Sequence, residues 1–213
     1  MIGVLDYGIG NLRSAEKALQ HLGADARLVA DPDEAATAEA LVLPGVGAFG
    51  PCARALRDSG LEPVARRAIE EERPFLGICV GFQLLYEGSD ESPGTEGLGA
   101  FEGVVRALPP GVKRPQMQWN LLEAVPGRTS AMLDGLGPSP WAYFVHSFAP
   151  DGGPDVVATC DYGGTVVAAA ERRRLWGAQF HPEKSGAVGL AILANFVALA
   201  AEAVPGTAGA RRA

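Results

Sequence analysis

A cysteine flanked by glycines is the residue best placed to do chemistry in this sequence. The segment Gly77-Ile78-Cys79-Val80-Gly81 lies where an apolar run gives way to a helix-like pattern. This spacing is typical of a nucleophile elbow, a strained turn from strand to helix in which flanking glycines avoid Cβ clashes. The helix start would favour a thiolate, and the Val80 N–H would face an oxyanion formed on attack. The pattern predicts that Cys79 is a nucleophile, and the alternative is a buried structural cysteine.

A thiolate nucleophile needs a base, and the chain has three histidines. His21 falls in a predicted helix, and His146 falls inside an apolar strand-like run, where a packing role is the plain interpretation. His181 follows the apolar run 175–180, at a strand end where catalytic groups gather in open α/β sheets. His181 is therefore the predicted base.

A carboxylate lies close enough in sequence to orient His181. Pro182 favours an extended backbone at His181, and in an extended stretch Glu183 points to the same side. We therefore predict a triad of Cys79, His181 and Glu183. A plain polar turn after a strand is the alternative interpretation of this segment.

Two further segments fit a covalent mechanism. The glycine-containing loop Pro44 to Gly47 follows a strand, so the Val46 N–H is a candidate second oxyanion donor beside that of Val80. Gln83 is four residues after Cys79, on the same helix face, and is a candidate substrate contact. A simple loop and an exposed helix glutamine are the respective alternatives.

The elements that must position these residues alternate between strand and helix. Strand-like runs at 2–5, 27–30, 41–43 and 75–78 are separated by helix-like segments at 12–22 and 51–72, the second broken near Gly60, and a helix is predicted to start at 80–86. Further strand-like runs follow at 104–108, 121–125, 143–148, 156–159, 166–170 and 175–180, then a helix at 187–203. We predict an open, mostly parallel α/β sheet with helices on both faces, as one domain over 1–204 with a disordered tail at 205–213.

Composition excludes several functional classes. The net charge of −7 argues against a nucleic-acid partner, and short basic clusters such as Arg172-Arg173-Arg174 are typical of a solvated face. Neither a signal peptide nor a membrane span is expected. Three cysteines without a CxxC pattern suit a reducing, cytoplasmic compartment, and Cys52 and Cys160 are expected to be packing residues. Ligand spacing favours no metal site, and we expect no cofactor.

With these residues in place, the chain resembles the class I (triad) glutamine amidotransferases, and among them the glutaminase subunits of imidazole glycerol phosphate synthase. The segments that carry the resemblance are VLDYGIGNLRS at 4–14, LPGVGAFG at 43–50, GICVGFQLL at 77–85, PQMQWN at 115–120, YFVHSF at 143–148 and QFHPEKSG at 179–186.

The resemblance implies that Cys79 attacks the side-chain amide of glutamine, that His181 protonates the departing ammonia, and that water hydrolyses the thioester to glutamate. Ammonia would pass to a (β/α)8-barrel cyclase subunit, which makes imidazole glycerol phosphate and an aminoimidazole carboxamide ribotide in histidine biosynthesis. The expected substrate-binding residues are Gly47, Gln83, His146 and Ser147. The residues expected near the partner are Asn11, Trp119, Tyr143 and Lys184.

The sequence departs from the family pattern at two positions. Gln118 stands where the family usually has glycine, and Phe148 stands where it usually has tyrosine. Three alternatives stay open: a glutaminase of another pathway, a stand-alone cysteine hydrolase of the DJ-1-like kind, and a catalytically silent subunit. The DJ-1-like kind usually has histidine at the position of Val80, and the intact triad argues against a silent subunit.

Overall fold

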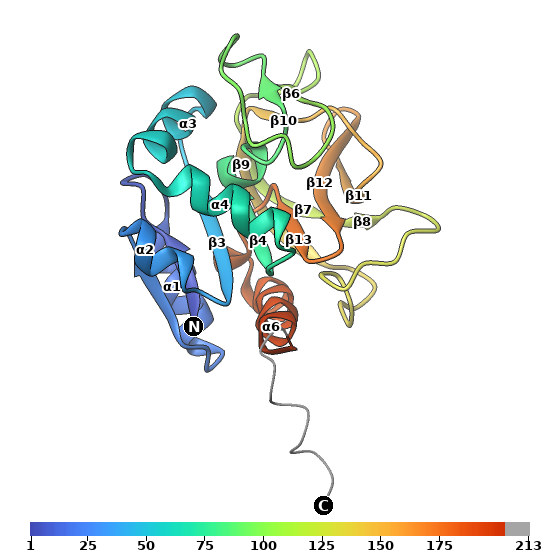
Figure 1. Ribbon diagram of the computed structural model, residues 1–213. Helices are drawn as coiled ribbons and strands as arrows, with labels where there is room; N and C mark the ends of the chain where they lie inside the picture. Colours follow the sequence, from blue (N-terminus) through green and yellow to red (C-terminus); the bar gives the residue numbers. More distant parts are fainter. Residues whose placement is uncertain (203–213) are drawn as a thin grey trace, which may run out of the picture.

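The computed structural model describes residues 1–202, and its core is an eight-stranded sheet (Figure 1). In spatial order the strands are β2 (Ala26–Val29), β1 (Ile2–Leu5), β3 (Ala40–Gly45), β4 (Phe75–Cys79), β13 (Leu175–Ala178), β12 (Thr165–Arg172), β11 (Val156–Asp161) and β8 (Glu123–Ala124). The pairs from β2 to β13 are parallel, and those from β13 to β8 are antiparallel. The predicted open, mostly parallel sheet is confirmed.

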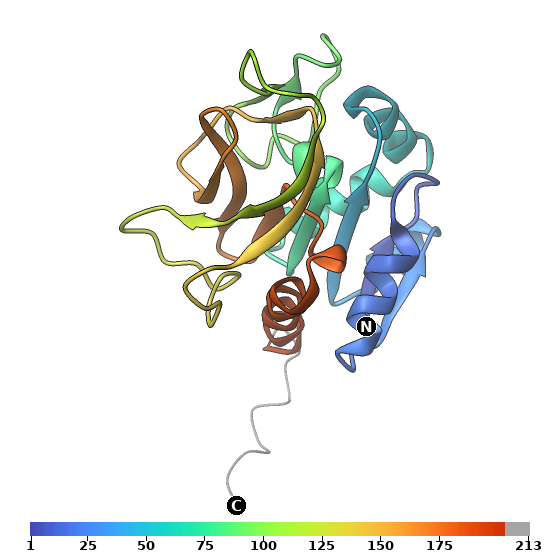
Figure 2. The same ribbon diagram turned by 180° about the vertical axis from the view of Figure 1, so that it is seen from behind.

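Helices cover both faces of the sheet, as the two opposite views show (Figures 1 and 2). The helices α3 (Phe49–Asp58) and α4 (Leu61–Glu70) lie on one face, where α2 (Pro32–Ala36) packs against α4. On the other face α1 (Leu12–His21) packs against α6 (Gly186–Glu202). The strands β3 and β4 are buried along their whole length, which explains why their sequences are continuously apolar.

Two smaller sheets complete the structure. One contains β10 (Phe148–Pro150), β6 (Val104–Ala107) and β5 (Gly88–Ser89), and the other pairs β7 (Gln116–Leu121) with β9 (Trp141–His146). The β7–β9 ribbon crosses the face that carries α1 and α6 (Figure 2), and it contacts α6 and the 3₁₀ turn η1 (Pro182–Lys184). This ribbon brings the end of β9 over the carboxyl end of β4.

The helix after Cys79 is shorter than predicted. α5 covers only Val80–Gln83, whereas the sequence pattern continues to Tyr86. The chain leaves the helix because the carbonyls of Leu84 and Leu85 accept hydrogen bonds from the Leu98 and Ala100 N–H groups, each at 2.7 Å. A helix of four residues has a small macrodipole, so the helix-dipole argument for a thiolate was too strong.

Several other predicted bounds were wrong. The predicted strand 121–125 is replaced by β7 and β8, and the predicted strand 143–148 is two strands separated at Ser147. The sequence pattern also missed α2. The predicted tail at 205–213 lies outside the described residues. None of the helices within residues 1–202 is long and apolar enough to cross a membrane.

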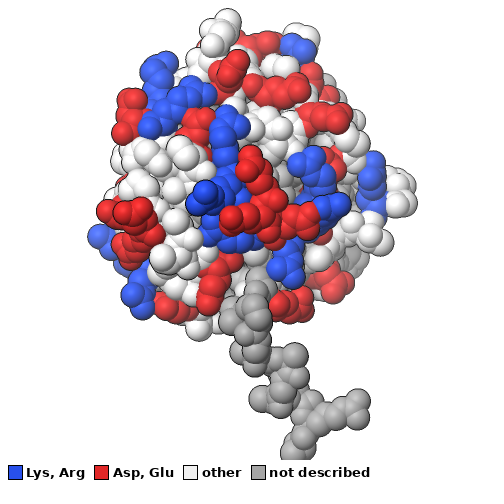
Figure 3. Space-filling view, viewed as in Figure 1, with Lys and Arg blue, Asp and Glu red and all other residues white. Residues whose placement is uncertain are grey.

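Basic and acidic side chains are interspersed on the face shown in Figure 3. Arg172 pairs with Asp155 at 3.6 Å, and Arg173 pairs with Glu72. Two of the three arginines at 172–174 are therefore paired with neighbouring carboxylates, as expected for a solvated face.

Candidate active site

The backbone at Cys79 has the strain that a nucleophile elbow requires. Cys79 ends β4 and precedes α5 with φ 56° and ψ −112°, a positive φ that side chains with a Cβ rarely adopt. A Cβ on Gly81 would lie 1.8 Å from the Leu43 carbonyl oxygen, and one on Gly77 would lie 2.8 Å from the Gly81 carbonyl oxygen. Glycine is therefore required at both flanking positions, as the sequence pattern predicts.

The structure brings His181 and Glu183 together at the same end of the sheet. The His181 Nδ1 lies 2.7 Å from the Glu183 Oε1, and both side chains are almost completely buried. The sequence argument for this pair was wrong in one respect, because Pro182–Lys184 forms a 3₁₀ turn rather than an extended stretch. Only His181 itself is extended, and the turn after it brings the carboxylate back to the imidazole.

Asn11 extends this pair to the first helix. It occupies the N-cap position of α1, but its side chain makes no capping hydrogen bond. Instead its Nδ2 donates to the Glu183 Oε1 at 2.9 Å, and its Oδ1 accepts from the Ser14 hydroxyl at 2.9 Å. Asn11 was expected near a partner, and the structure additionally connects it to the candidate triad.

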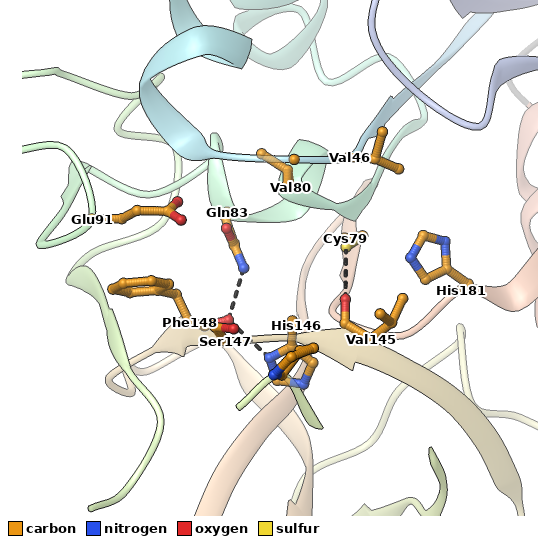
Figure 4. A pocket seen from close by; sticks show the side chains of 12 residues that line it. Val46, Cys79, Val80, Gln83, Glu91, Val145, His146, Ser147, Phe148 and His181 are labelled. Atoms are coloured by element: carbon orange, nitrogen blue, oxygen red, sulfur yellow. Dashed lines mark hydrogen bonds between the residues drawn. The ribbon is translucent and has the colours of Figure 1, made fainter. Parts of the chain in front are cut away.

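The charges of this cluster favour a protonated imidazole. Burial alone would lower the pKa of His181, but hydrogen bonds and charge from Cys79 and Glu183 raise it to about 10. Burial would raise the pKa of Glu183, but the His181 and Asn11 contacts lower it on balance. The imidazole lies beside the Cys79 sulfur (Figure 4), and its buried Nε2 has no hydrogen-bond partner within the described residues. This nitrogen is placed to exchange a proton with a group at the sulfur.

Replacing Glu183 with glutamine tests this electrostatic arrangement. Because the carboxylate stabilises the imidazolium, Glu183→Gln is expected to lower the pKa of His181 by about 1 to 3. In the wild type, the raised pKa of His181 also stabilises the folded protein. This stabilisation is complete below the ordinary imidazole pKa of 6.5 and is lost as pH rises through about 10. NMR titration of the labelled imidazole measures the change. The exposed carboxylate Glu123 gives a control, Glu123→Gln, and equal effects of both variants would contradict the prediction.

A cavity of about 240 Å³ opens at the Cys79 sulfur (Figure 4). It is lined by Val46, Gly47, Cys79, Val80, Gln83, Glu91, Pro115, Val145, His146, Ser147, Phe148 and His181. The four residues predicted to bind substrate and the two predicted to supply oxyanion donors all line it. Their roles remain predictions, but the fold places them together.

The polar groups of the cavity have defined orientations. The Gln83 Nε2 donates to the Phe148 carbonyl oxygen at 2.8 Å and to the Gln179 Oε1 at 3.0 Å, which leaves its own Oε1 free to accept. Burial lowers the pKa of His146 to about 4, and its Nδ1 lies 2.8 Å from the same Phe148 carbonyl oxygen. His146 is therefore neutral and donates through Nδ1. Because only the backbone of Phe148 takes part, phenylalanine in place of tyrosine leaves these bonds intact.

Glu91 is a pocket residue that sequence reasoning missed. Its Oε2 accepts from the Phe49 N–H at 2.8 Å, which holds the carboxylate at the start of α3. The residue comes from the acidic loop 90–96, and nothing in the sequence distinguishes it from the solvated carboxylates around it.

Two buried side chains fix the loop that carries Val46, the candidate oxyanion donor. The Tyr7 hydroxyl donates to the Pro44 carbonyl oxygen at 2.6 Å, and the Cys52 thiol donates to the Val46 carbonyl oxygen at 3.2 Å. Burial raises the pKa of Cys52 to about 11 and that of Cys160 likewise to about 11. Both are therefore neutral thiols in the interior, in keeping with the predicted packing role.

The residues expected near a partner gather around η1. The Trp119 side chain is 48% exposed and packs edge-on against Tyr143, with ring centroids 6.1 Å apart. The Tyr143 N–H donates to the Ser185 hydroxyl at 2.9 Å, next to exposed Lys184. Gln118 is an exposed residue of β7, so its side chain needs no space in the interior.

Together, the open α/β sheet, the cysteine elbow and the buried His–Glu pair define a class of cysteine-dependent hydrolytic enzymes. The chain belongs to the class I glutamine amidotransferase family, whose model matches residues 3–200. Its relatives within this family include subunits of one particular synthase.

A protein of Thermosynechococcus vestitus, named imidazole glycerol phosphate synthase subunit HisH, is 50% identical over 204 residues, which cover 93% of this chain and 96% of that protein. Proteins of the same name from Salinibacter ruber and Methanothermobacter thermautotrophicus are 46% and 47% identical, covering 93% and 92% of this chain and 94% and 98% of theirs. A crystal structure of a glutamine amidotransferase has a TM-score of 0.74 at 24% identity, covering 94% of this chain and 98% of that one, and supports the fold alone.

Proposed function

We propose that this chain hydrolyses glutamine to glutamate and ammonia through a thioester on Cys79, and that the ammonia serves imidazole glycerol phosphate synthesis in histidine biosynthesis. The observation that carries the proposal is the strained Cys79 beside the buried His181–Glu183 pair, at a small cavity lined by polar groups. The assignment to this pathway is supported by the relatives named as synthase subunits, which are 46% to 50% identical.

The residues act in the following order. The Cys79 thiolate attacks the side-chain amide carbon of glutamine, and the N–H groups of Val80 and Val46 stabilise the resulting oxyanion. His181 gives a proton to the leaving nitrogen, so ammonia departs and a thioester remains. The same imidazole then takes a proton from a water molecule, which hydrolyses the thioester to glutamate and frees Cys79.

Glu91 is the group that recognises the α-ammonium of glutamine. It is the one carboxylate among the cavity-lining residues of the described chain, and an ammonium group pairs with a carboxylate. Glu91→Gln keeps an oxygen for the Phe49 N–H but removes the charge. It is expected to raise KM for glutamine by about 10-fold to 100-fold with little change in kcat.

Steady-state kinetics of glutamate release measure this effect. Glu96, an exposed carboxylate in the same loop, supplies the control Glu96→Gln. An unchanged KM in Glu91→Gln would assign ammonium recognition elsewhere.

The partner is the cyclase subunit of the synthase, with a (β/α)8 barrel, and it docks on the surface around η1. Trp119, Tyr143 and Lys184 form this surface, and Asn11 connects it to Glu183 at 2.9 Å. Docking on this surface therefore acts close to the triad, which provides a physical route for activation by the partner. The complex works in the cytoplasm, a reducing compartment in which buried thiols stay unpaired.

Glutamate release tests the proposal. It is measured for this chain alone, and then with the cyclase subunit and its nucleotide substrate. We expect low release alone and a sharp increase in the mixture. High release that is indifferent to the cyclase would assign the chain to another pathway, and no release in either case would make it a silent subunit.

A further inference from the structure

Gln179 is a completely buried amide placed against the sulfur of Cys79. It follows β13 directly, and its Nε2 lies 3.9 Å from the Cys79 Sγ. Its Oε1 accepts from the Gln83 Nε2 at 3.0 Å. Burying an amide costs free energy unless its polar atoms are hydrogen-bonded, so these two contacts identify the partners of the buried Gln179 amide.

The contacts of Gln83 determine which end of the Gln179 amide faces the sulfur. The Phe148 carbonyl oxygen can only accept a hydrogen bond, so the end of Gln83 at 2.8 Å from it must be the Nε2. That same nitrogen contacts Gln179, which must therefore present its oxygen there. The Gln179 Nε2, a donor only, is left facing Cys79.

The sulfur thus has both a donor and an acceptor within 4.0 Å. The Val145 carbonyl oxygen is 4.0 Å from the Cys79 Sγ, where it can accept from a thiol but disfavours a thiolate. The Gln179 N–H favours the thiolate, because a hydrogen bond to the charged form stabilises that form.

We propose that Gln179 is a further catalytic residue of this site: its amide N–H donates to the Cys79 thiolate and holds the sulfur in position for attack. The inference rests on the proposed function for the meaning of that attack, but the contact itself concerns the sulfur alone. Gln83 then has two roles, since it orients Gln179 through Nε2 and offers its Oε1 to the substrate.

A second buried glutamine makes the comparison within the same chain. The Gln116 Nε2 lies 4.0 Å from the Cys160 Sγ, but its Oε1 has no partner within residues 1–202, and Cys160 is completely buried. The Gln116–Cys160 pair also places an amide beside a thiol, but no second contact determines which end of the Gln116 amide faces the sulfur. Gln116 is therefore a matched control.

The test is the pH profile of Cys79 alkylation by iodoacetamide, followed by peptide mass spectrometry in the full-length protein. Gln179→Met has a similar length and no N–H donor. We expect its profile to move upward by about one pH unit, and alkylation at pH 7 to slow by about tenfold. Gln116→Met is expected to leave the Cys79 profile unchanged.

The remaining titratable groups around the sulfur are the same in all these variants. They are His181 with Glu183 behind it, Tyr7 and Cys52 beneath the loop, and His146 and Glu91 across the cavity. A displaced profile in the Gln179 variant alone therefore reports the amide.

A Gln179→Met profile that superimposes on the wild type would overturn the inference. If Gln179→Met does not fold, as judged by thermal unfolding, Gln179→Asn takes its place, because the shorter side chain withdraws the N–H from the sulfur. Glutamate release by the wild-type complex is measured in parallel. No glutamate release would count against the proposed function, whereas the alkylation profile tests the Gln179 contact independently.

Discussion

Replacing Cys79 with alanine is expected to lower kcat for glutamine hydrolysis by at least about 10⁴-fold, because the thioester cannot form without the sulfur. Binding of the cyclase subunit should persist, since Cys79 is 4% exposed and lines the cavity rather than the proposed docking surface. Glutamate release and a binding titration with the cyclase measure the two properties separately.

The backbone conformation at Cys79 also leads to a prediction about the relative stability of its glycine and alanine variants. Glycine normally destabilises a regular element relative to alanine by roughly 0.5 to 1 kcal/mol. At φ 56° and ψ −112° the order should reverse, because glycine avoids the Cβ strain that alanine retains. We expect Cys79→Gly to be more stable than Cys79→Ala by about 1 to 2 kcal/mol, while both are inactive.

Thermal unfolding measures this order as a difference in Tm of about 2 to 8 °C for a chain of this size. An alanine variant equal to or more stable than the glycine variant would show that the turn is not strained at Cys79.

Replacing Gly81 with alanine is expected to be the most destabilising small change at the elbow. The new Cβ would lie 1.8 Å from the Leu43 carbonyl oxygen, which belongs to the backbone of buried β3 and cannot rotate away. Either α5 or β3 must move, so we expect a loss of about 3 kcal/mol or more, which corresponds to a fall in Tm of roughly 6 to 12 °C. Glutamine hydrolysis should fall with it, because the Cys79 turn would be displaced.

Gly137→Ala is the matched control for this variant. Gly137 has no atom within 4 Å of an added Cβ and no positive φ, so its replacement should leave Tm nearly unchanged. A Gly81→Ala protein as stable as Gly137→Ala would contradict the close approach of α5 and β3.

The features of the site that could be predicted from the sequence are local ones. The elbow is recognisable because its glycines and its cysteine lie within five residues, and each glycine has a steric cause in the structure. The His181–Glu183 pair is likewise close in sequence, although the turn that joins it is a 3₁₀ turn and not extended. Parallel strands were recognisable because burial on both faces makes them continuously apolar.

The features that were missed depend on pairs far apart in the chain. In β7, with the sequence QMQWNL, polar and apolar residues alternate, but none is β-branched and the apolar Met117 and Trp119 are exposed. The segment forms a strand by pairing with β9. Asn11 contacts Glu183 across 172 positions, and Gln179 contacts Cys79 across 100. Composition and spacing carry no signal for such contacts, because they arise only when the sheet brings its strand ends together.

The most direct test of the central claim is to identify the residue modified by a glutamine analogue that carries an electrophilic ketone in place of the side-chain amide. The complex with the cyclase subunit is treated with this analogue, and the modified peptide is identified by mass spectrometry. We predict one adduct per chain, on Cys79, with activity lost in proportion and protection by glutamine. Modification of Cys52 or Cys160 instead, or full activity after Cys79 has been modified, would contradict the assignment of Cys79 as the nucleophile.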